Sequence, residues 1–316
     1  MAGHGGSKTA VIAAIVGNLI IAIIKFIAAA ITGSSAMISE GIHSLVDTGN
    51  GGLLLHGMSR AKIPADEGHP FGHGKALYFW TLVVSVSIFG IGGGMSLYEG
   101  ISHMRHVAPG AVLSDPTLNY IVLGIAMLVE GWSFSVAIRE FIKAKGPQKS
   151  WEYIRSAKDP STYTIVLEDS AAMAGLVFAF LGVFLGHLFE NPYLDGAASI
   201  IIGVLLMSVA FILAFETKGL LLGEGVDTAT LADMRARIQA DPAVSAVGDI
   251  LTMYMGPYEL LVNLGVSFEP GTTVEESHAA IQRIEADLVC AYPQCARIYI
   301  EAESLKPLTL DGGVPV

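Results

Sequence analysis

Side chains that can bind metal ions stand inside two long apolar runs of the sequence. His43 and Asp47 are four residues apart in the run 35–59, so in a helix they share one face, one turn apart. Glu168 and Asp169 stand in the run 161–188. An imidazole nitrogen and a carboxylate oxygen at the His43–Asp47 spacing would supply half of a tetrahedral zinc site.

Both runs are long enough to cross a bilayer as helices, where an ionised side chain costs about 2.5–3.5 kcal/mol. Asp47 is 13 residues from Arg60, and Asp169 is 11 residues from Lys158. At 1.5 Å of rise per residue the two carboxylates differ in depth by about 3 Å. We therefore expect Asp47 and Asp169 to meet near mid-membrane. The alternative is that His43 and Asp47 only form hydrogen bonds within the helix bundle.

The loop after the run 35–59 carries a second group of possible ligands. Asp66, His69 and His73 fall within eight residues, and the two histidines flank a turn that contains glycine. The spacing is compatible with a second cation site, and solvated histidines explain it equally well.

Other polar groups in the apolar runs have less specific interpretations. Glu130 is expected to serve either as a proton relay or as the buried partner of Lys25, which can also reach outward to the membrane surface. Asn18 is expected to bond across helices, and the glycines of 90–94 allow another helix to approach closely.

Composition and run length place these residues in a polytopic membrane protein. Of the 316 residues, 52% are hydrophobic and 15% are charged, whereas soluble domains carry about 25% charged residues. Lone apolar runs in lipid must satisfy their own backbone hydrogen bonds, so the predicted spans are helices. Six spans are expected, at residues 9–32, 35–59, 75–101, 117–138, 161–188 and 193–222.

Basic residues cluster in alternate loops and predict the orientation of the chain. They border the second-to-third loop and fill the fourth-to-fifth loop, which places both termini in the cytoplasm. Residues 224–316 carry 5 basic and 14 acidic side chains. This acidity argues against nucleic acid as a partner, because phosphate would be repelled.

The C-terminal part has the pattern of a small α+β domain with a ferredoxin-like sandwich. Helices are expected at 228–239 and from 273 to about 289, with Thr273 as N-cap and Glu276 as its capping-box partner. Strands are expected at 244–255, 260–268 and 297–303. The predicted domains are a transmembrane domain at 1–223, a cytosolic domain at 224–305 and a tail at 306–316.

Two motifs resemble those of one known family. Residues 40–47 read EGIHSLVD and residues 69–75 read HPFGHGK, which resembles the cation diffusion facilitator family over about residues 9–303. The resemblance implies a homodimeric antiporter that exchanges a cytoplasmic divalent metal for protons. It also implies a transport site at His43 and Asp47, and a dimer contact at Lys75. The loop residues Asp66, His69 and His73 match the family's loop site.

The sequence departs from the family pattern in the fifth span and in the tail. Ile165 stands four residues before Asp169, where the family has histidine. Glu168 and Asp169 point about 100° apart on a helix, and Asp169 is the first choice as ligand. The pair resembles the branch that contains the mitochondrial zinc transporter.

In the tail only two residues fall at positions where relatives bind zinc. These are His278 and Glu301, so weak metal binding or none is expected there. Cys290 and Cys295 are soft ligands near the end of the second tail helix, and core packing is the favoured interpretation for both.

The sequence therefore predicts a transporter rather than an enzyme. We expect proton-coupled efflux of a divalent metal by alternating access, with Zn²⁺ as first choice and protons as counter-ion, in a bacterial inner membrane. The alternatives are Mn²⁺, Co²⁺, Ni²⁺ or Fe²⁺ as cargo, or a membrane metal sensor or scaffold that transports nothing.

Overall fold

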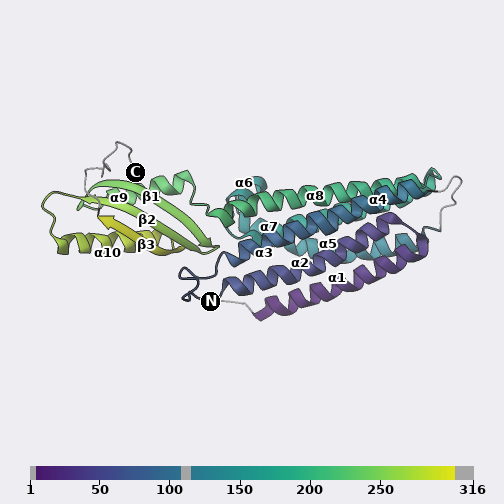
Figure 1. Cartoon of the computed structure of the whole chain (residues 1–316), viewed down its shortest axis with the longest axis horizontal. Helices are drawn as coiled ribbons and strands as arrows, with labels where there is room; N and C mark the ends of the chain where they lie inside the picture. The colour runs from purple at the N-terminus through teal and green to yellow at the C-terminus, as the bar shows by residue number, and fades with distance from the viewer. Residues whose placement is uncertain (1–4, 108–114, 303–316) are drawn as a thin grey trace. The chain divides into compact units, whose positions relative to one another are not determined.

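A computed structural model describes residues 5–107 and 115–302, with side chains from residue 15 onward (Figure 1). These residues form two compact units. The first comprises the chain up to Arg60 together with Ala76–Lys218, and the second comprises Ala61–Lys75 together with the chain from Gly219 onward. The loop with the HPFGHGK motif thus belongs with the C-terminal residues. The predicted tail at 306–316 lies outside the described residues.

The first unit is built from long helices, which begin and end close to the predicted limits of the apolar runs (Figure 1). They are α1 (Gly5–Thr32), α2 (Ser35–Ala61), α3 (Ala76–Ser87), α5 (Thr117–Lys145), α7 (Pro160–Leu188) and α8 (Tyr193–Leu222). Helix α3 continues through a π-helical segment η1 (Ile88–Gly94) into α4 (Met95–His106), and a short helix α6 spans Ser150–Ser156. The sequence did not predict α6.

Five of the helices in the described part of the chain are long and apolar enough to cross a membrane. They are α1, the continuous helix Ala76–His106, α5, α7 and α8. Helix α2 forms at the predicted place and has 27 residues, but it is more polar than these five. Its polar side chains include Ser39, Glu40, His43 and Asn50, which are buried in the protein. The helix positions are confirmed, and a count of six spans stays a prediction.

The glycines of η1 allow α8 to pack closely, as predicted. A Cβ atom added to Gly93 would lie 2.5 Å from Met207 Cγ and 3.0 Å from the backbone oxygen of Gly203. Only a residue without a side chain permits this approach. At Gly90, one turn earlier, an added Cβ would have nothing within 4 Å.

The start of α2 is held by a buried acid on α8. Asp195 Oδ1 accepts a hydrogen bond of 2.6 Å from Ser34 Oγ, and Asp195 Oδ2 accepts one of 3.3 Å from the backbone N–H of Ala36. The unpaired N–H groups at a helix N-terminus favour a negative charge. This contact fixes the end of the helix that carries His43 and Asp47.

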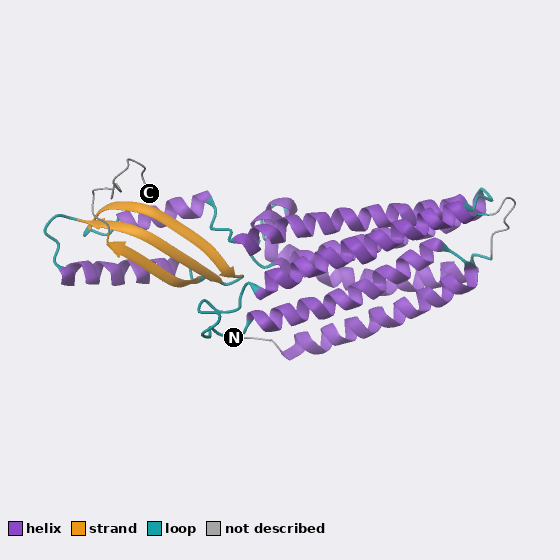
Figure 2. Cartoon of the chain, in the orientation of Figure 1, coloured by secondary structure: helices purple, strands orange, loops and turns teal. Residues whose placement is uncertain are grey.

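The second unit contains a three-stranded mixed sheet with two helices, as predicted for αββαβ (Figure 2). Its elements are α9 (Thr228–Gln239), β1 (Val244–Gly256), β2 (Glu259–Phe268), α10 (Val274–Ala291) and β3 (Cys295–Ala302). Strand β2 is central and pairs antiparallel with β1 and parallel with β3. Helix α9 contacts β1, α10 contacts β3, and the two helices contact each other.

Local signals and packing explain this unit. The predicted capping box forms, because Thr273 N donates to Glu276 Oε2 over 2.8 Å and Glu276 N donates to Thr273 Oγ1 over 3.3 Å. The core joins apolar side chains of both helices and all three strands, including Cys295. Cys290 is exposed, so core packing was wrong for that residue, which lies on the outer side of α10.

Candidate functional site

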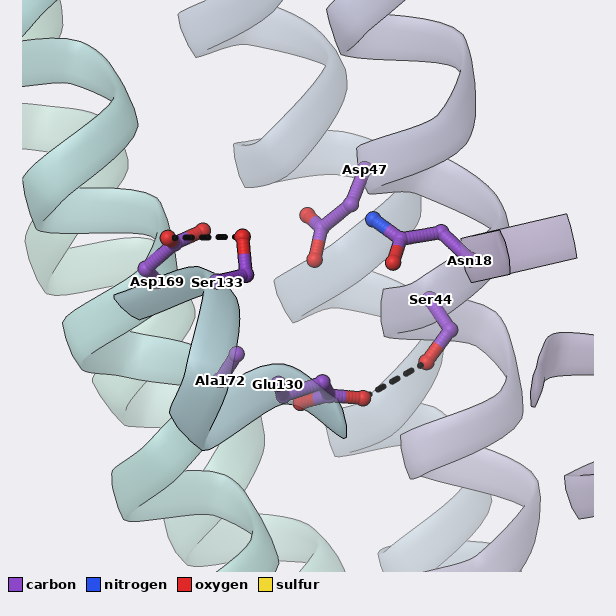
Figure 3. A pocket seen from close by; sticks show the side chains of 7 residues that line it. All are labelled: Asn18, Ser44, Asp47, Glu130, Ser133, Asp169 and Ala172. Atoms are coloured by element: carbon purple, nitrogen blue, oxygen red, sulfur yellow. Dashed lines mark hydrogen bonds between the residues drawn. The ribbon is translucent and has the colours of Figure 1, made fainter. Parts of the chain in front are cut away.

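A small pocket lies inside the helical unit (Figure 3). Helices α1, α2, α5 and α7 line it through Asn18, Ser44, Asp47, Glu130, Ser133, Asp169 and Ala172. Three of these helices each contribute two residues spaced by three positions, which is the spacing of one helical face. The pocket therefore lies where one face of each of these helices meets the faces of the others, and most of the residues that line it are polar.

Asp47 and Asp169, which the depth count predicts to meet, both line this pocket. In Figure 3 they approach it from opposite sides, with Ser133 between them. Ser133 Oγ donates a hydrogen bond of 3.4 Å to Asp169 Oδ2. The Oδ1 atom of Asp47 is buried and has no hydrogen-bond partner among the described residues. A buried carboxylate oxygen without a partner is unfavourable, so Asp47 is suited to accept a cation.

His43 lies beside Asp47, one turn away on α2. Its side chain is almost fully buried, and its Nε2 atom is 3.4 Å from Asp47 Oδ2. Neither ring nitrogen makes a hydrogen bond within the described part of the chain. His43 does not itself line the pocket. Its link to the pocket is the contact with Asp47, and its role as a metal ligand stays a prediction.

Glu168 and Asp169 have different partners, as expected for adjacent positions on a helix. The Oε1 atom of Glu168 accepts a hydrogen bond of 2.9 Å from Asn50 Nδ2 of α2. Only Asp169 lines the pocket. Asp169 thus faces the pocket and Glu168 links α7 to α2, while the choice of Asp169 as metal ligand stays a prediction.

Lys25 is buried and does not extend to the membrane surface, so that alternative was wrong. Its Nζ atom donates three hydrogen bonds of 2.9 Å each, to Glu40 Oε2, Ser44 Oγ and Glu130 Oε1. Burying an ammonium group is costly unless acceptors surround it, and here two carboxylates and a hydroxyl do so. The pair of Lys25 with Glu130 therefore forms, while a relay role for Glu130 stays a prediction.

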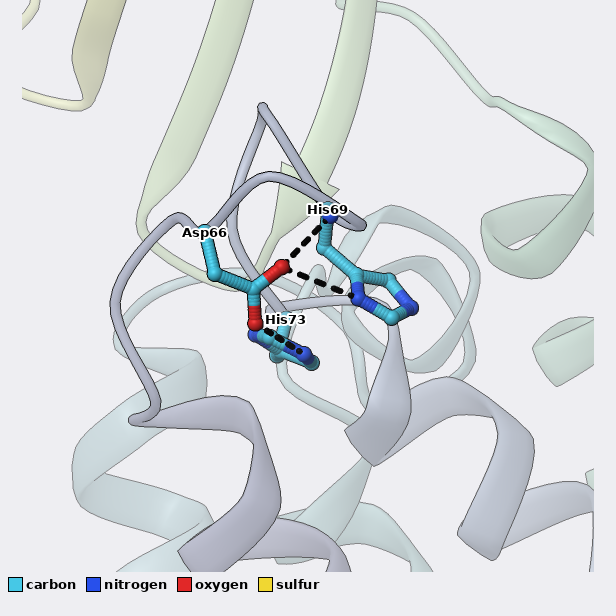
Figure 4. Close-up of side chains that lie close together, drawn as sticks. All are labelled: Asp66, His69 and His73. Atoms are coloured by element: carbon cyan, nitrogen blue, oxygen red, sulfur yellow. Dashed lines mark hydrogen bonds and ion pairs between the residues drawn. The ribbon is translucent and has the colours of Figure 1, made fainter.

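The loop residues form a tighter group of possible metal ligands (Figure 4). Ligand atoms of Asp66, His69 and His73 all lie within 4.8 Å of one another. His69 Nδ1 is 3.4 Å from Asp66 Oδ1, and His73 Nε2 is 3.5 Å from Asp66 Oδ2. No other group of three such residues is this close in the described parts of the chain. The residues predicted for the transport site do not form such a group among the described residues.

Backbone contacts hold this loop in place. The backbone N–H of His69 donates a hydrogen bond of 2.7 Å to Asp66 Oδ1, which lowers the pKa of the Asp66 carboxyl. Arg297 of β3 donates to the backbone oxygen of Pro70 over 2.9 Å, and its guanidinium group lies 5.3 Å from the centre of the Phe71 ring. The loop is therefore anchored to the sheet of the same unit.

The remaining predicted residues lie apart from both groups. Lys75 Nζ is 3.4 Å from Met253 Sδ of β1, and its role in a dimer stays a prediction. His278 is exposed on α10, where its Nε2 atom is 3.1 Å from Gln282 Nε2. Glu301 is exposed on β3. Among the described residues neither joins two further possible ligands, so metal binding there also stays a prediction.

Sequence reasoning missed the residues that orient the predicted ligands. Asn50 follows Asp47 by three positions, and Ser133 follows Glu130 by three positions, so both stand on the faces already identified. A search for polar residues three or four positions from each buried acid would have found them. The hydrogen bond between Lys25 and Glu40 could not be predicted from spacing along one helix, because the two residues belong to separate helices.

Comparison with known proteins shows which family the chain resembles. Residues 11–222 match the cation efflux transmembrane domain family. The chain is 33% identical over 287 residues to the proton-coupled zinc antiporter SLC30A9, mitochondrial, of Xenopus laevis, a match that covers 90% of this chain and 50% of that protein. It is 28% identical over 271 residues to metal tolerance protein C4 of Arabidopsis thaliana, covering 85% and 59% of the two chains.

A third relative matches along most of its own length. Magnetosome protein MamM of Paramagnetospirillum magneticum is 23% identical over 296 residues, covering 91% of this chain and 85% of that one. In contrast, the chain spans about half the length of the SLC30A9 proteins that it matches. The family match extends from α1 to the end of α8 and so includes every helix that lines the pocket. The chain therefore belongs to the cation efflux, or cation diffusion facilitator, family.

Proposed function

We propose that this protein exports a divalent transition metal, with Zn²⁺ as first choice, in exchange for protons. The observation that carries the proposal is that Asp47 of α2 and Asp169 of α7 line one pocket within an apolar helical unit. His43 adds a buried imidazole 3.4 Å from Asp47. The names of relatives that are proton-coupled zinc antiporters support the same choice of cargo and counter-ion.

The donor set explains how metal and protons would exchange. Carboxylates and imidazole bind a metal only in their deprotonated forms, so a metal that enters from the cytoplasm releases protons from the site. After the helices expose the pocket to the opposite side, protons compete for the same atoms and displace the metal. An inward proton gradient thus drives export by alternating access.

The positions of Asp47 and Asp169 on separate helices support a movement of α2 relative to α7 when metal binds. Asp47 and Asp169 belong to different helices, and with His43 they do not form a compact group of three ligand atoms among the described residues. A bound dication would draw α2 and α7 together, because it attracts both carboxylates. The hydrogen bond from Asn50 of α2 to Glu168 of α7 already links the same two helices.

The loop site is proposed as a second metal site that regulates transport. Asp66, His69 and His73 are already close together, and β3 anchors their loop through Arg297. Basic residues near this loop place it on the cytoplasmic side by the positive-inside rule. We propose six spans, cytoplasmic termini, and a homodimer with Lys75 at its contact.

Zinc flux into proteoliposomes tests the main proposal. The purified full chain should accumulate zinc when a proton gradient of the correct direction is imposed, and Asp47→Asn should abolish this uptake. Asp115→Asn is the matched control, because Asp115 is exposed before α5 and outside the pocket. Equal zinc uptake by Asp47→Asn and the wild type would exclude the proposed transport site.

The same vesicles separate the alternatives. Competition by Mn²⁺, Co²⁺, Ni²⁺ and Fe²⁺ against labelled zinc identifies the preferred cargo. A sensor or scaffold would bind zinc at equilibrium and yet move none across the membrane, even with a proton gradient.

A further inference from the structure

Lys25 occupies the centre of a polar cluster that joins three helices. Its side chain is fully buried on α1, and its three N–H groups are directed to Glu40 and Ser44 of α2 and to Glu130 of α5. One ammonium group thus serves two carboxylates. If both are ionised, the cluster keeps one negative charge that no described basic residue in contact with it balances.

Glu40 and Glu130 each bind Lys25 through one carboxylate oxygen, and their other oxygens lie in different surroundings. Glu40 Oε1 lies against α7, where a Cβ added to Gly175 would be only 2.5 Å away. Glu40 is fully buried and does not line the pocket. Its Oε1 atom is also buried without a hydrogen-bond partner among the described residues, but it lies outside the pocket.

Glu130 is placed differently, because it lines the pocket together with Asp47 and Asp169 (Figure 3). Its Oε1 atom binds Lys25, while its buried Oε2 atom has no hydrogen-bond partner among the described residues. Three carboxylates from α2, α5 and α7 thus border one small space. A cation in that space would satisfy the free oxygens of both Asp47 and Glu130.

We propose that Glu130 is a further metal-contacting residue of the transport pocket and that Lys25 is the positioning residue that holds its carboxylate at the pocket wall. This inference rests on the proposed function, since it assumes that the cargo occupies the space between Asp47 and Asp169. Lys25 acts by fixing one oxygen of Glu130, which leaves the other for the metal. Ser44, which lines the pocket and accepts from Lys25, helps to set the position of the ammonium group.

A change of ligand type tests direct contact. In Glu130→Cys a soft thiolate replaces a hard carboxylate, which favours Cd²⁺ over Zn²⁺ at any position that touches the metal. We expect the ratio of cadmium to zinc uptake by the full chain in proteoliposomes to rise by at least about fivefold. The matched control is Glu40→Cys, which removes the other carboxylate bound to Lys25 and should leave this ratio unchanged, whatever it does to the rate.

Kinetics then test the oxygen ligand itself. Glu130→Gln should raise the KM for zinc by at least about tenfold, since the loss of a group that supports a metal site costs about 10–100-fold in affinity. A wild-type KM in Glu130→Gln together with a wild-type metal ratio in Glu130→Cys would overturn the inference. Size-exclusion elution and thermal unfolding show whether each variant is folded. If one of the two Glu130 variants does not fold, the other alone decides the test.

The role of Lys25 is tested by a double-mutant cycle. Lys25→Met should raise the KM for zinc in the wild-type background and have little further effect in Glu130→Gln. Lys25→Arg keeps the positive charge and the hydrogen-bond donors, so its KM for zinc should lie closer to the wild-type value than that of Lys25→Met. If Lys25 only filled space, Lys25→Arg would show no such recovery. Equal effects of Lys25→Met in both backgrounds would exclude positioning through Glu130.

Asp47→Asn in the same vesicles distinguishes the two possible failures. If Asp47→Asn transports zinc normally, the proposed function fails and this inference fails with it. If Asp47→Asn abolishes transport while both Glu130 variants behave as the wild type, only the inference about Glu130 is wrong.

Discussion

Glu168 and Asp169 are adjacent in the sequence, but only Asp169 lines the pocket, whereas Glu168 accepts a 2.9 Å hydrogen bond from Asn50. The helix turns by about 100° between them. Helix α7 therefore presents one carboxylate to the pocket and the other to helix α2. The two acids are therefore expected to have separable effects on transport.

Asp169→Asn should abolish zinc uptake or raise its KM by at least about tenfold, because it removes a charge at the pocket. Glu168→Gln should lower the maximal rate more than it raises the KM, since an amide can still bond to Asn50 but no longer carries charge. Initial rates of zinc uptake over a range of zinc concentrations check both. A larger KM effect for Glu168→Gln than for Asp169→Asn would reverse the assignment.

The loop site should bind one zinc ion per chain through Asp66, His69 and His73. His73→Ala should remove this zinc, as measured by metal content after dialysis of the full chain. His278→Ala is the control, because that exposed histidine on α10 has no pair of further ligands nearby among the described residues. Unchanged metal content in His73→Ala would contradict the site.

The carboxyl of Asp66 should remain available as a zinc ligand in mild acid. The N–H of His69 lowers the pKa of Asp66, so this group stays ionised to a lower pH than an ordinary aspartate. Metal ligands bind in their deprotonated forms, so Asp66 should contribute to zinc binding down to at least about pH 4, the ordinary aspartate value. Asp66→Asn should therefore weaken zinc binding throughout the range from about pH 7 to about pH 5, as zinc titrations at several pH values would show. Equal zinc affinity of Asp66→Asn and the wild type across this range would contradict a role for Asp66.

The close contact between η1 and α8 should make Gly93 sensitive to substitution. Gly93→Ala places a Cβ against Met207 and Gly203, and overpacking of this kind costs about 1–3 kcal/mol. Gly90→Ala is the matched control in the same segment, because its Cβ would meet nothing within 4 Å. Thermal unfolding of the detergent-solubilised chain should show a lower Tm for Gly93→Ala only. Equal Tm values would show that α8 can move aside.

The C-terminal unit should lose stability in acid through Asp241. Arg283 of α10 donates to both of its oxygens, over 2.8 and 2.9 Å, and lowers the pKa of the Asp241 carboxyl. Because the pKa is lower in the folded state, the stabilisation is present above the ordinary aspartate pKa of about 4 and is lost as pH falls through the folded value.

Arg283→Gln should therefore increase hydrogen exchange in α10 at pH 6 and increase it less at about pH 3, because the stabilisation is lost as pH falls toward the folded pKa of Asp241. Hydrogen exchange of the full chain, corrected for intrinsic rates, measures this difference. An effect of equal size at both pH values would show that Arg283 acts through packing.

The order of the helices and strands could be predicted from the sequence because local signals define them. Apolar runs of membrane length gave the helices of the first unit, and the Thr273–Glu276 capping box gave the start of α10. The low hydropathy of α2 follows from its many polar residues, several of them buried in the protein, which is why that predicted span is the least clear by composition.

The sequence by itself determined which residues could bind a metal ion, since spacing along a helix decides which side chains share a face. Only the tertiary structure decided which of them meet. It placed Asp169 in the pocket and Glu168 on Asn50, and it surrounded Lys25 with acceptors from two other helices. The rotation of one helix against another depends on packing between residues far apart in the chain, and that information is not contained in the period of any single helix.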